Sequence, residues 1–344
     1  MAASLGAARR CSQNSTATTS VRRVELCSLE ARAQGQRRHI AFSKQPKLTP
    51  QHMDRGSARR NLQILRESTT VTVAQVNSGS TSVVPAEPLS FSFSASGLLF
   101  PYYIGVIEVL LDAGLITDET HIAGTSGGGL VSACIANGVQ PQQLLDTVCM
   151  LYENLRDYGS PLDAFAGRLE GPLRLALASL LPTDAHLGAA GRTSISVTQM
   201  WPPPMSGDIV TSWSSKADLI DCIVASCYLP GFLGSKPAAN FRERPCWDGG
   251  MIRENILPPA ATSTTVNISA FPSDTFETFG LNERVQIYPN IVPENFPYAA
   301  LDYMKWIGVP PDQAEIAALY TLGRDSAKHW LSQPSSNDLV GMAK

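Results

Sequence analysis

The alternation of apolar and polar positions along the chain predicts its first elements. Apolar and small polar residues alternate over 89–94, which predicts a short β-strand. Pro101 suits the first turn of a helix that runs to Gly114. Residues 121–125 predict a second short strand, and a helix over 127–137 follows directly. Strand followed by helix, twice in succession, indicates an α/β fold around a central sheet.

The rest of the chain continues this rhythm. The same patterns predict strands at 193–198, 208–213 and 264–271 and a helix at 216–227. A long helix after Pro310-Pro311 carries an apolar stripe, which is most simply a packing face. Residues 161–182 are apolar on nearly every side in their second half. That segment is either a helix packed in the core or a lid that contacts lipid.

One uncharged stretch, residues 88–107, has the length of a membrane span. It contains four serines and the central Pro101, and its first half alternates with period two. A strand, a break and a helix explain this pattern better, so no transmembrane segment is predicted.

Composition and charge narrow the function classes. The chain has 44% hydrophobic and 17% charged residues, which is typical of a globular protein. Residues 1–60 contain 12 of the 27 Lys and Arg residues but only three of the 30 acidic ones, so the remainder is strongly acidic. Nucleic-acid binding needs clustered cations and is therefore not expected. Any contact with a membrane would have to be apolar.

The N-terminal segment has a composition of its own. Residues 1–60 are rich in Arg and Ser, which indicates a transit-type segment or a disordered basic tail. We expect a plastid location, with the mitochondrion, the cytoplasm or a lipid droplet as alternatives. Residues 61–87 read as a linker, because they end in a run rich in Ser, Thr and Gly.

Ser126 is the candidate nucleophile. It lies in Gly124-Thr125-Ser126-Gly127-Gly128, which fits the G-x-S-x-G elbow between a predicted strand and a predicted helix. The glycines allow the backbones to pass closely, and the helix directs free N–H groups toward an oxyanion. A glycine-rich turn that merely packs a helix on a sheet is the alternative. A Walker phosphate loop is excluded, because no Lys-Ser or Lys-Thr follows the glycines.

A serine hydroxyl needs a base. Asp248, in Asp248-Gly249-Gly250, is the candidate, although Asp-Gly-Gly is equally an ordinary turn. The histidines are weaker candidates: His186 falls in a predicted loop and His329 in the C-terminal helix. His121 is too near the elbow in sequence to reach the serine. A triad in the order Ser126, Asp248, His329 remains formally possible.

The two motifs together resemble the Ser–Asp dyad of the patatin-like phospholipases. The surrounding sequence supports a narrower similarity to the adipose triglyceride lipase branch. This similarity is carried by Ser92-Phe93-Ser94-Ala95-Ser96-Gly97-Leu98-Leu99, Tyr102-Tyr103-Ile104-Gly105-Val106 and Val224-Ala225-Ser226-Cys227-Tyr228-Leu229-Pro230. The resemblance covers roughly residues 89–272.

The resemblance implies a three-layer α/β fold with a central, mostly parallel sheet flanked by helices. It places a catalytic domain at 88–272 and a helical C-terminal extension at 273–344. Ser126 would attack the acyl ester of a glycerolipid, and Asp248 would act as general base. The residues themselves imply no metal or organic cofactor, because the sequence shows no ligand cluster and no dinucleotide fingerprint. The possible partners are the glycerolipid and an apolar membrane or lipid-droplet surface; the oligomeric state is open.

The resemblance also implies a glycine-rich loop that stabilises the oxyanion. The expected donors are the backbone N–H groups of Ser96, Gly97, Leu98 and Gly127. This chain departs from the family's G-x-G-x-x-G pattern, because Ala95 and Phe100 stand where glycines are common. A positive φ at either residue would cost about 1–2 kcal/mol. The alternatives to hydrolysis are therefore a silent lipid-binding protein with the same fold and a lipid transacylase.

Overall fold

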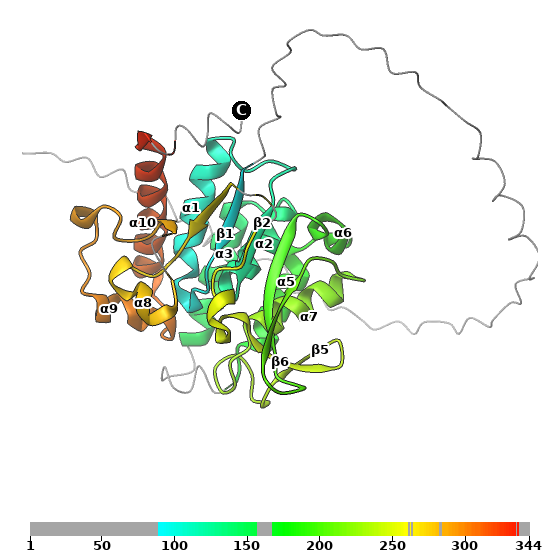
Figure 1. Ribbon diagram of the computed structural model, residues 1–344. Coiled ribbons are helices and arrows are strands. Elements are labelled where there is room, and N and C mark those ends of the chain that lie inside the picture. The colour runs from blue at the N-terminus through cyan, green and yellow to red at the C-terminus, as the bar shows by residue number, and fades with distance from the viewer. Residues whose placement is uncertain are drawn as a thin grey trace, which may run out of the picture. The chain divides into compact units, whose positions relative to one another are not determined.

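The computed structural model describes residues 89–156, 167–260, 262, 264–281, 284–334 and 336 (Figure 1). They belong to one compact unit that spans Ser80–Lys344. The predicted transit-type segment at 1–60 and the linker at 61–87 lie outside the described residues, as does the first part of the apolar segment at 161–182. Within the described residues, no helix is both long enough and apolar enough to cross a membrane.

A mostly parallel sheet forms the centre of the described chain, in the order β5-β6-β3-β2-β1-β7-β8, with β4 also paired to β3. Five neighbouring strands of this sheet, namely β3, β2, β1, β7 and β8, run parallel to one another. Strands β4 and β6 run antiparallel to β3, and β5 antiparallel to β6. The strands are β1 (Ser90–Phe93), β2 (Ile122–Thr125), β3 (Thr193–Gln199), β4 (Ser206–Val210), β5 (Ala239–Phe241), β6 (Arg244–Asp248), β7 (Thr265–Ile268) and β8 (Val285–Ile287).

Helices flank this sheet and complete a three-layer α/β fold (Figure 1). The α-helices are α1 (Phe100–Asp112), α2 (Gly127–Ala136), α3 (Pro141–Arg156), α5 (Glu170–Leu180), α6 (Ala185–Ala189), α7 (Lys216–Ser226), α8 (Phe276–Phe279), α9 (Ala300–Met304) and α10 (Gln313–Ser332). The short 3-10 helices are η1 (Gly97–Leu99), η2 (Gly249–Met251), η3 (Arg253–Asn255), η4 (Ser273–Thr275), η5 (Pro293–Asn295) and η6 (Lys305–Ile307).

Strand β1 is buried on both faces, although its sequence alternates phenylalanine with serine. The serine face is satisfied by hydrogen bonds: Ser92 donates to the carbonyl oxygen of Pro258 at 2.5 Å, and the hydroxyl groups of Ser94 and Tyr103 lie 3.0 Å apart. A central strand of a parallel sheet is covered on both sides, so its polar side chains must be small and paired.

Helix α10 lies directly against α1 (Figure 1). A Cβ on Gly105 of α1 would collide with the backbone of α10, and a Cβ on Gly323 would collide with that of α1. Asp312 caps α10, because its side chain accepts from the N–H of Glu315, whose own carboxylate accepts from the N–H of Asp312. This capping box begins the helix just after Pro310-Pro311, where the sequence predicts its start.

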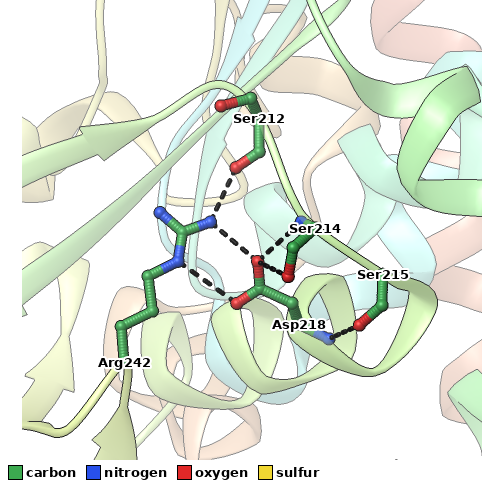
Figure 2. A network of polar contacts seen from close by, with 5 residues as sticks. All are labelled: Ser212, Ser214, Ser215, Asp218 and Arg242. Atoms are coloured by element: carbon green, nitrogen blue, oxygen red, sulfur yellow. Dashed lines mark hydrogen bonds and ion pairs between the residues drawn. The ribbon is translucent and has the colours of Figure 1, made fainter. Parts of the chain in front are cut away.

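Helix α7 is fixed at its N-terminus by a polar network (Figure 2). Ser215 accepts a hydrogen bond from the N–H of Asp218, as an N-cap residue does. The carboxylate of Asp218 in turn accepts from the N–H of Ser214 and pairs with Arg242 at 2.8 Å. Arg242 belongs to the tight turn between β5 and β6, so the network ties the start of α7 to that hairpin.

Two expectations about local structure are corrected. His186 belongs to the short helix α6, not to a loop. Strand β4 ends at Val210, so the predicted alternation up to Trp213 extends past the paired residues.

Helix α5 lies in the described part of the apolar segment at 161–182 and is partly buried. Leu173 and Leu177 are buried, whereas Leu175 is 75% exposed.

Candidate active site

Ser126 lies on a sharp turn between β2 and α2. Its φ of 56° and ψ of −124° are strained for a residue with a side chain and cost about 1–3 kcal/mol. The turn needs its glycines, because a Cβ on Gly124 would collide with the backbone of Gly128. These features are those of a nucleophile elbow, which projects the serine from the edge of the sheet.

Neighbouring segments hold this elbow in place. The backbone N–H of Ser126 donates to the hydroxyl oxygen of Ser226, at the end of α7, at 2.9 Å. The hydroxyl of Thr125 donates to the carbonyl oxygen of Asn255 at 2.5 Å. The side chain of Ser226 is completely buried, so the nucleophile's own backbone is tied to the helix that the network of Figure 2 anchors.

Asp248 ends strand β6, opposite Val197 of β3. Its N–H donates to the carbonyl oxygen of Tyr228 at 2.8 Å, and its own carbonyl accepts from the hydroxyl of Thr198 at 2.8 Å. The carboxylate accepts from the N–H of Gly250, also at 2.8 Å. Gly249 is required, because a Cβ there would collide with the backbone of Ser196. The Asp-Gly-Gly motif is therefore tightly fixed at the sheet edge.

The structure brings Ser126 and Asp248 together. Burial raises the pKa of Asp248 to about 6, and hydrogen bonds from the Gly250 N–H and from the Ser126 side chain lower it by less than burial raises it. Both side chains are 6% exposed and line the same cavity. A carboxylate in this state is a stronger base than an exposed aspartate and is ionised in most molecules at pH 7.

The loop after β1 lies against the elbow. A Cβ on Gly127 would collide with the hydroxyl of Ser96 and lie 3.5 Å from the carbonyl oxygen of Gly97. Within the described chain, the N–H groups of Ser96, Gly97 and Leu98 donate to no acceptor. Gly97, Leu98 and Gly127 line the cavity, whereas Ser96 is fully buried behind them. Buried N–H groups without acceptors beside a nucleophile form a site for an oxyanion.

The departure from the family's glycine pattern proves harmless to the backbone. Gly97 has φ of +54°, the left-handed region, and it is the one loop position where glycine remains. Phe100 has φ of −48°, and Ala95 is not among the described residues with positive φ. Neither replacement is therefore strained.

An apolar cavity of about 420 Å³ opens above Ser126 and Asp248. One face of α5 and the loop at 229–233 line it, and none of its described lining residues is Lys, Arg or His. The lining residues are Ala95, Gly97, Leu98, Phe100, Ser126, Gly127, Leu130, Leu144, Thr147, Val148, Leu151, Tyr152, Leu169, Leu173, Ala176, Leu177, Leu180, Cys227, Leu229, Phe232, Leu233, Asp248, Gly250, Met251, Ile256, Phe271, Phe279, Ile307 and Gly308. Such a lining suits an acyl chain.

The three histidines that the structure describes lie elsewhere. His121 precedes β2, at the end of the strand remote from Ser126, and its Nε2 lies 3.2 Å from the hydroxyl of Ser194. His186 is on α6 and His329 on α10, and neither lines the cavity. Among the described residues, no group of three or more His, Cys, Asp or Glu side chains could hold a metal ion.

The comparison with known families agrees with this geometry. The patatin-like phospholipase model matches residues 91–261, a range that contains the elbow, the oxyanion loop and Asp248. The chain belongs to the patatin-like phospholipase family. The predicted family and fold are thereby confirmed, and the relatives agree with the narrower similarity to the adipose triglyceride lipase branch.

The relatives of this patatin-like protein differ in the activities their names describe. It is 30% identical over 194 residues to the omega-hydroxyceramide transacylase of Mus musculus, covering 55% of this chain and 31% of that one. It is 28% identical over 254 residues to the human patatin-like phospholipase domain-containing protein 4, covering 71% and 96%. It is 30% identical over 191 residues to the human patatin-like phospholipase domain-containing protein 2, covering 54% and 36%. The chain thus spans about a third of the first and last of these.

Sequence reasoning missed three residues at the site. Ser226 lies in a stretch that carries the resemblance, but nothing in the sequence pattern predicts that its hydroxyl oxygen accepts a hydrogen bond from the N–H of Ser126. Tyr152 and Ile307 lie in α3 and η6, outside the recognised motifs, and both line the cavity. Their sequence neighbours give no signal, because their roles arise from contacts with residues far away in the chain.

Proposed function

We propose that this patatin-like protein hydrolyses fatty-acyl esters of glycerolipids through Ser126 and Asp248. The observation that carries the proposal is the meeting of a strained serine and a buried, cation-free carboxylate at the base of an apolar cavity. Family membership supports a lipid-acting hydrolase or acyltransferase. The proposed substrate class comprises phospholipids, galactolipids and triacylglycerols.

The proposed reaction has two steps. Asp248 takes the proton of the Ser126 hydroxyl as its oxygen attacks the ester carbonyl, and the N–H groups of Gly97, Leu98 and Gly127 stabilise the oxyanion. The C–O bond to the leaving alcohol then breaks, and Asp248 returns the proton to that alcohol. Asp248 then takes a proton from a water molecule as the water oxygen attacks the acyl-serine. The bond between the acyl carbon and the Ser126 oxygen breaks, Asp248 returns the proton to that oxygen, and the fatty acid leaves.

Turnover of a chromogenic acyl ester tests the dyad. We expect Ser126→Ala and Asp248→Asn each to lower kcat by about 10³-fold or more, because each removes a group of the same catalytic unit. His329→Asn separates the dyad from a triad and should leave kcat unchanged. Ser332→Ala, an exposed serine on α10, is the matched control. Equal rates for wild type and Ser126→Ala would leave only the silent lipid-binding alternative.

Transacylation is the second candidate, and the name of the mouse relative favours it. The acyl-serine would then be attacked by an alcohol of a second lipid in place of water. Incubation with a glycerolipid acceptor distinguishes the two reactions, because hydrolysis releases free fatty acid whereas transacylation yields a newly acylated acceptor. A mixture would show partition of one acyl-enzyme between two nucleophiles.

We further propose that the cavity mouth contacts the lipid surface. Leu229 and Met251 line the cavity and are 36% and 42% exposed, and Val309, next to the lining Gly308, is 37% exposed. Because the body of the protein is acidic, attraction to an anionic surface cannot supply this contact. An apolar rim continuous with the cavity can do so.

Activity on emulsified ester, compared with activity on dissolved ester, tests whether this rim contacts lipid. We expect Met251→Ser combined with Val309→Ser to lower the ratio of activity on emulsified ester to activity on dissolved short-chain ester severalfold. Leu301→Ser is the matched control, because Leu301 is 87% exposed on α9 and does not line the cavity. An equal effect of the control would contradict a specific contact surface.

A further inference from the structure

The oxyanion loop contains one flexible position, Gly97, from which donors could be lost. The loop's N–H groups at residues 96–98 have no acceptor in the described chain. Gly97 has a left-handed φ, and because a glycine can adopt several other backbone conformations as well, this φ alone does not hold the loop in place. A rotated peptide plane would turn a donor away from the nucleophile. Two contacts from other segments fix the loop from outside.

The first contact comes from α3. The hydroxyl of Tyr152 donates to the carbonyl oxygen of Leu98 at 3.1 Å, and the Tyr152 side chain is 2% exposed. On the other side of the same peptide, the N–H of Leu99 donates to the carbonyl oxygen of Ser96 at 3.2 Å. Both groups of this peptide plane are thus held, so its orientation is fixed.

The second contact comes from η6, about 200 residues further along the chain. A Cβ placed on Gly97 would lie 2.5 Å from the carbonyl oxygen of Ile307 and 2.8 Å from its Cγ2 methyl, so the two backbones touch. Ile307 is itself supported by its neighbour Trp306, which is 3% exposed. The Trp306 ring lies 5.2 Å from that of Tyr298 and 5.7 Å from that of Tyr303.

We propose that Tyr152 and Ile307 are positioning residues that hold the oxyanion loop in its donating conformation. The proposal rests on the proposed function and assigns to two segments outside the recognised motifs a role in the same reaction. Neither residue gives or takes a proton. Tyr152 holds the carbonyl oxygen of Leu98, and Ile307 packs against Gly97.

The alternative is that both residues only stabilise the fold. The two cases differ in kinetics, because a positioning residue acts on the transition state and lowers kcat with little change in KM. A residue with a purely structural role lowers the fraction of folded protein but leaves the kcat of each folded molecule unchanged. Kinetics must therefore be normalised to folded protein, measured by circular dichroism.

Tyr152→Phe is the decisive variant, because it removes only the hydroxyl. Tyr303→Phe is its matched control, because it keeps the ring that packs against Trp306 and also removes only a hydroxyl that donates to a buried backbone carbonyl, that of Ala270, at 3.1 Å. Tyr303 does not line the cavity. We expect kcat for a dissolved ester to fall about tenfold in Tyr152→Phe and to stay at the wild-type value in Tyr303→Phe. Loss of a whole donor costs about 10²–10³-fold.

Two substitutions that change the shape of the side chain test the role of Ile307. Ile307→Val keeps the Cγ2 methyl that faces Gly97, whereas Ile307→Leu keeps the volume but loses that branch. We expect the valine variant to retain several times more of the wild-type kcat than the leucine variant. Equal kcat in the two variants, or no loss in Tyr152→Phe relative to Tyr303→Phe, would overturn the positioning role.

Labelling with a fluorophosphonate probe separates this failure from failure of the proposed function. If wild type reacts with the probe at Ser126 and turns over ester while the positioning variants match it, only the positioning role fails. If wild type neither reacts nor turns over, the proposed function itself is wrong.

Discussion

Two aspartates of this chain show how surroundings decide what a carboxylate does. Asp218, at the start of α7, pairs with Arg242 and accepts from the N–H of Ser214 (Figure 2). Hydrogen bonding to Arg242 is the largest of the influences that together lower its pKa below the ordinary 3.8. Asp248, at the end of β6, has no Lys, Arg or His among the described residues that line its cavity, and burial raises its pKa to about 6.

The contrast teaches that the same residue type holds a helix in one place and, in the proposed reaction, serves as a base in the other. The charge of Asp218 is stabilised by its partners, so the residue holds a helix and has little tendency to take up a proton. The charge of Asp248 is poorly compensated, so the residue accepts a proton readily. The free energy that this carboxylate costs the fold is what makes it a base.

The largest expected effect is on activity as a function of pH. Asp248 must be ionised to take the serine proton, so kcat/KM should fall about tenfold for each pH unit below about 6. A limb near the ordinary aspartate value would contradict the raised pKa. The measurement is a kcat/KM profile with a dissolved ester.

The acid side of this pH profile falls close to the pH at which a histidine base would lose activity. The sequence alone did not suggest this, because it does not show that the pKa of Asp248 is raised. An ordinary histidine titrates near 6.5. A pH profile by itself therefore no longer separates an aspartate base from a histidine base. The same profile in His329→Asn does so, because the limb should persist unchanged if Asp248 is the base.

The next effect is on stability, and its sign is unusual for an active-site variant. The folded pKa of Asp248 lies above the unfolded value of 3.8, so the ionised carboxylate destabilises the fold at pH 7. Two pKa units correspond to roughly 3 kcal/mol. We expect Asp248→Asn to raise the free energy of unfolding by up to about that amount, measured by urea denaturation at pH 7.

The gain should shrink as the pH falls from 6 to 4 and vanish below about 4, where the wild-type carboxyl is protonated in both states. A destabilised Asp248→Asn at pH 7 would show that the carboxylate is better compensated than its burial indicates.

The smallest effect has the opposite sign and pH dependence. The folded pKa of Asp218 lies below its unfolded value, so its stabilisation is present above pH 3.8 and is lost as the pH falls through the folded pKa. Asp218→Ala should lower the free energy of unfolding by about 1–2 kcal/mol at pH 7, through loss of the ion pair and of the bond to Ser214. The kcat of folded protein should not change. A large loss of kcat would mean that the α7 anchor reaches Ser126 through Ser226.

Much of the local structure could be predicted from the sequence, because short-range patterns carry it. The alternation at 89–94, the helix at 216–227 and the stripe of the last helix correspond to β1, α7 and α10. The helical state of His186 was missed, because a five-residue helix is too short to show a period. Strand β4 was placed slightly too far along the chain, because strand ends depend on a pairing partner.

The candidate site divides in the same way. Ser126 and Asp248 could be predicted because glycines mark the close backbone approaches beside them, and only glycine fits there. The sequence could not predict the roles of Ser226, Tyr152 and Ile307. Their side chains are of common types, and each contacts a residue that lies 54 to 210 positions away in the chain.

By itself, the sequence indicated most of the elements, the family and the two candidate reactive side chains, since periodicity, turn chemistry and motif spacing are local properties. Only the tertiary structure decided how deeply Asp248 is buried, what contacts the loop after β1 and which residues line the cavity. Those depend on burial and on the distances between atoms of remote segments, and the packed fold alone sets them.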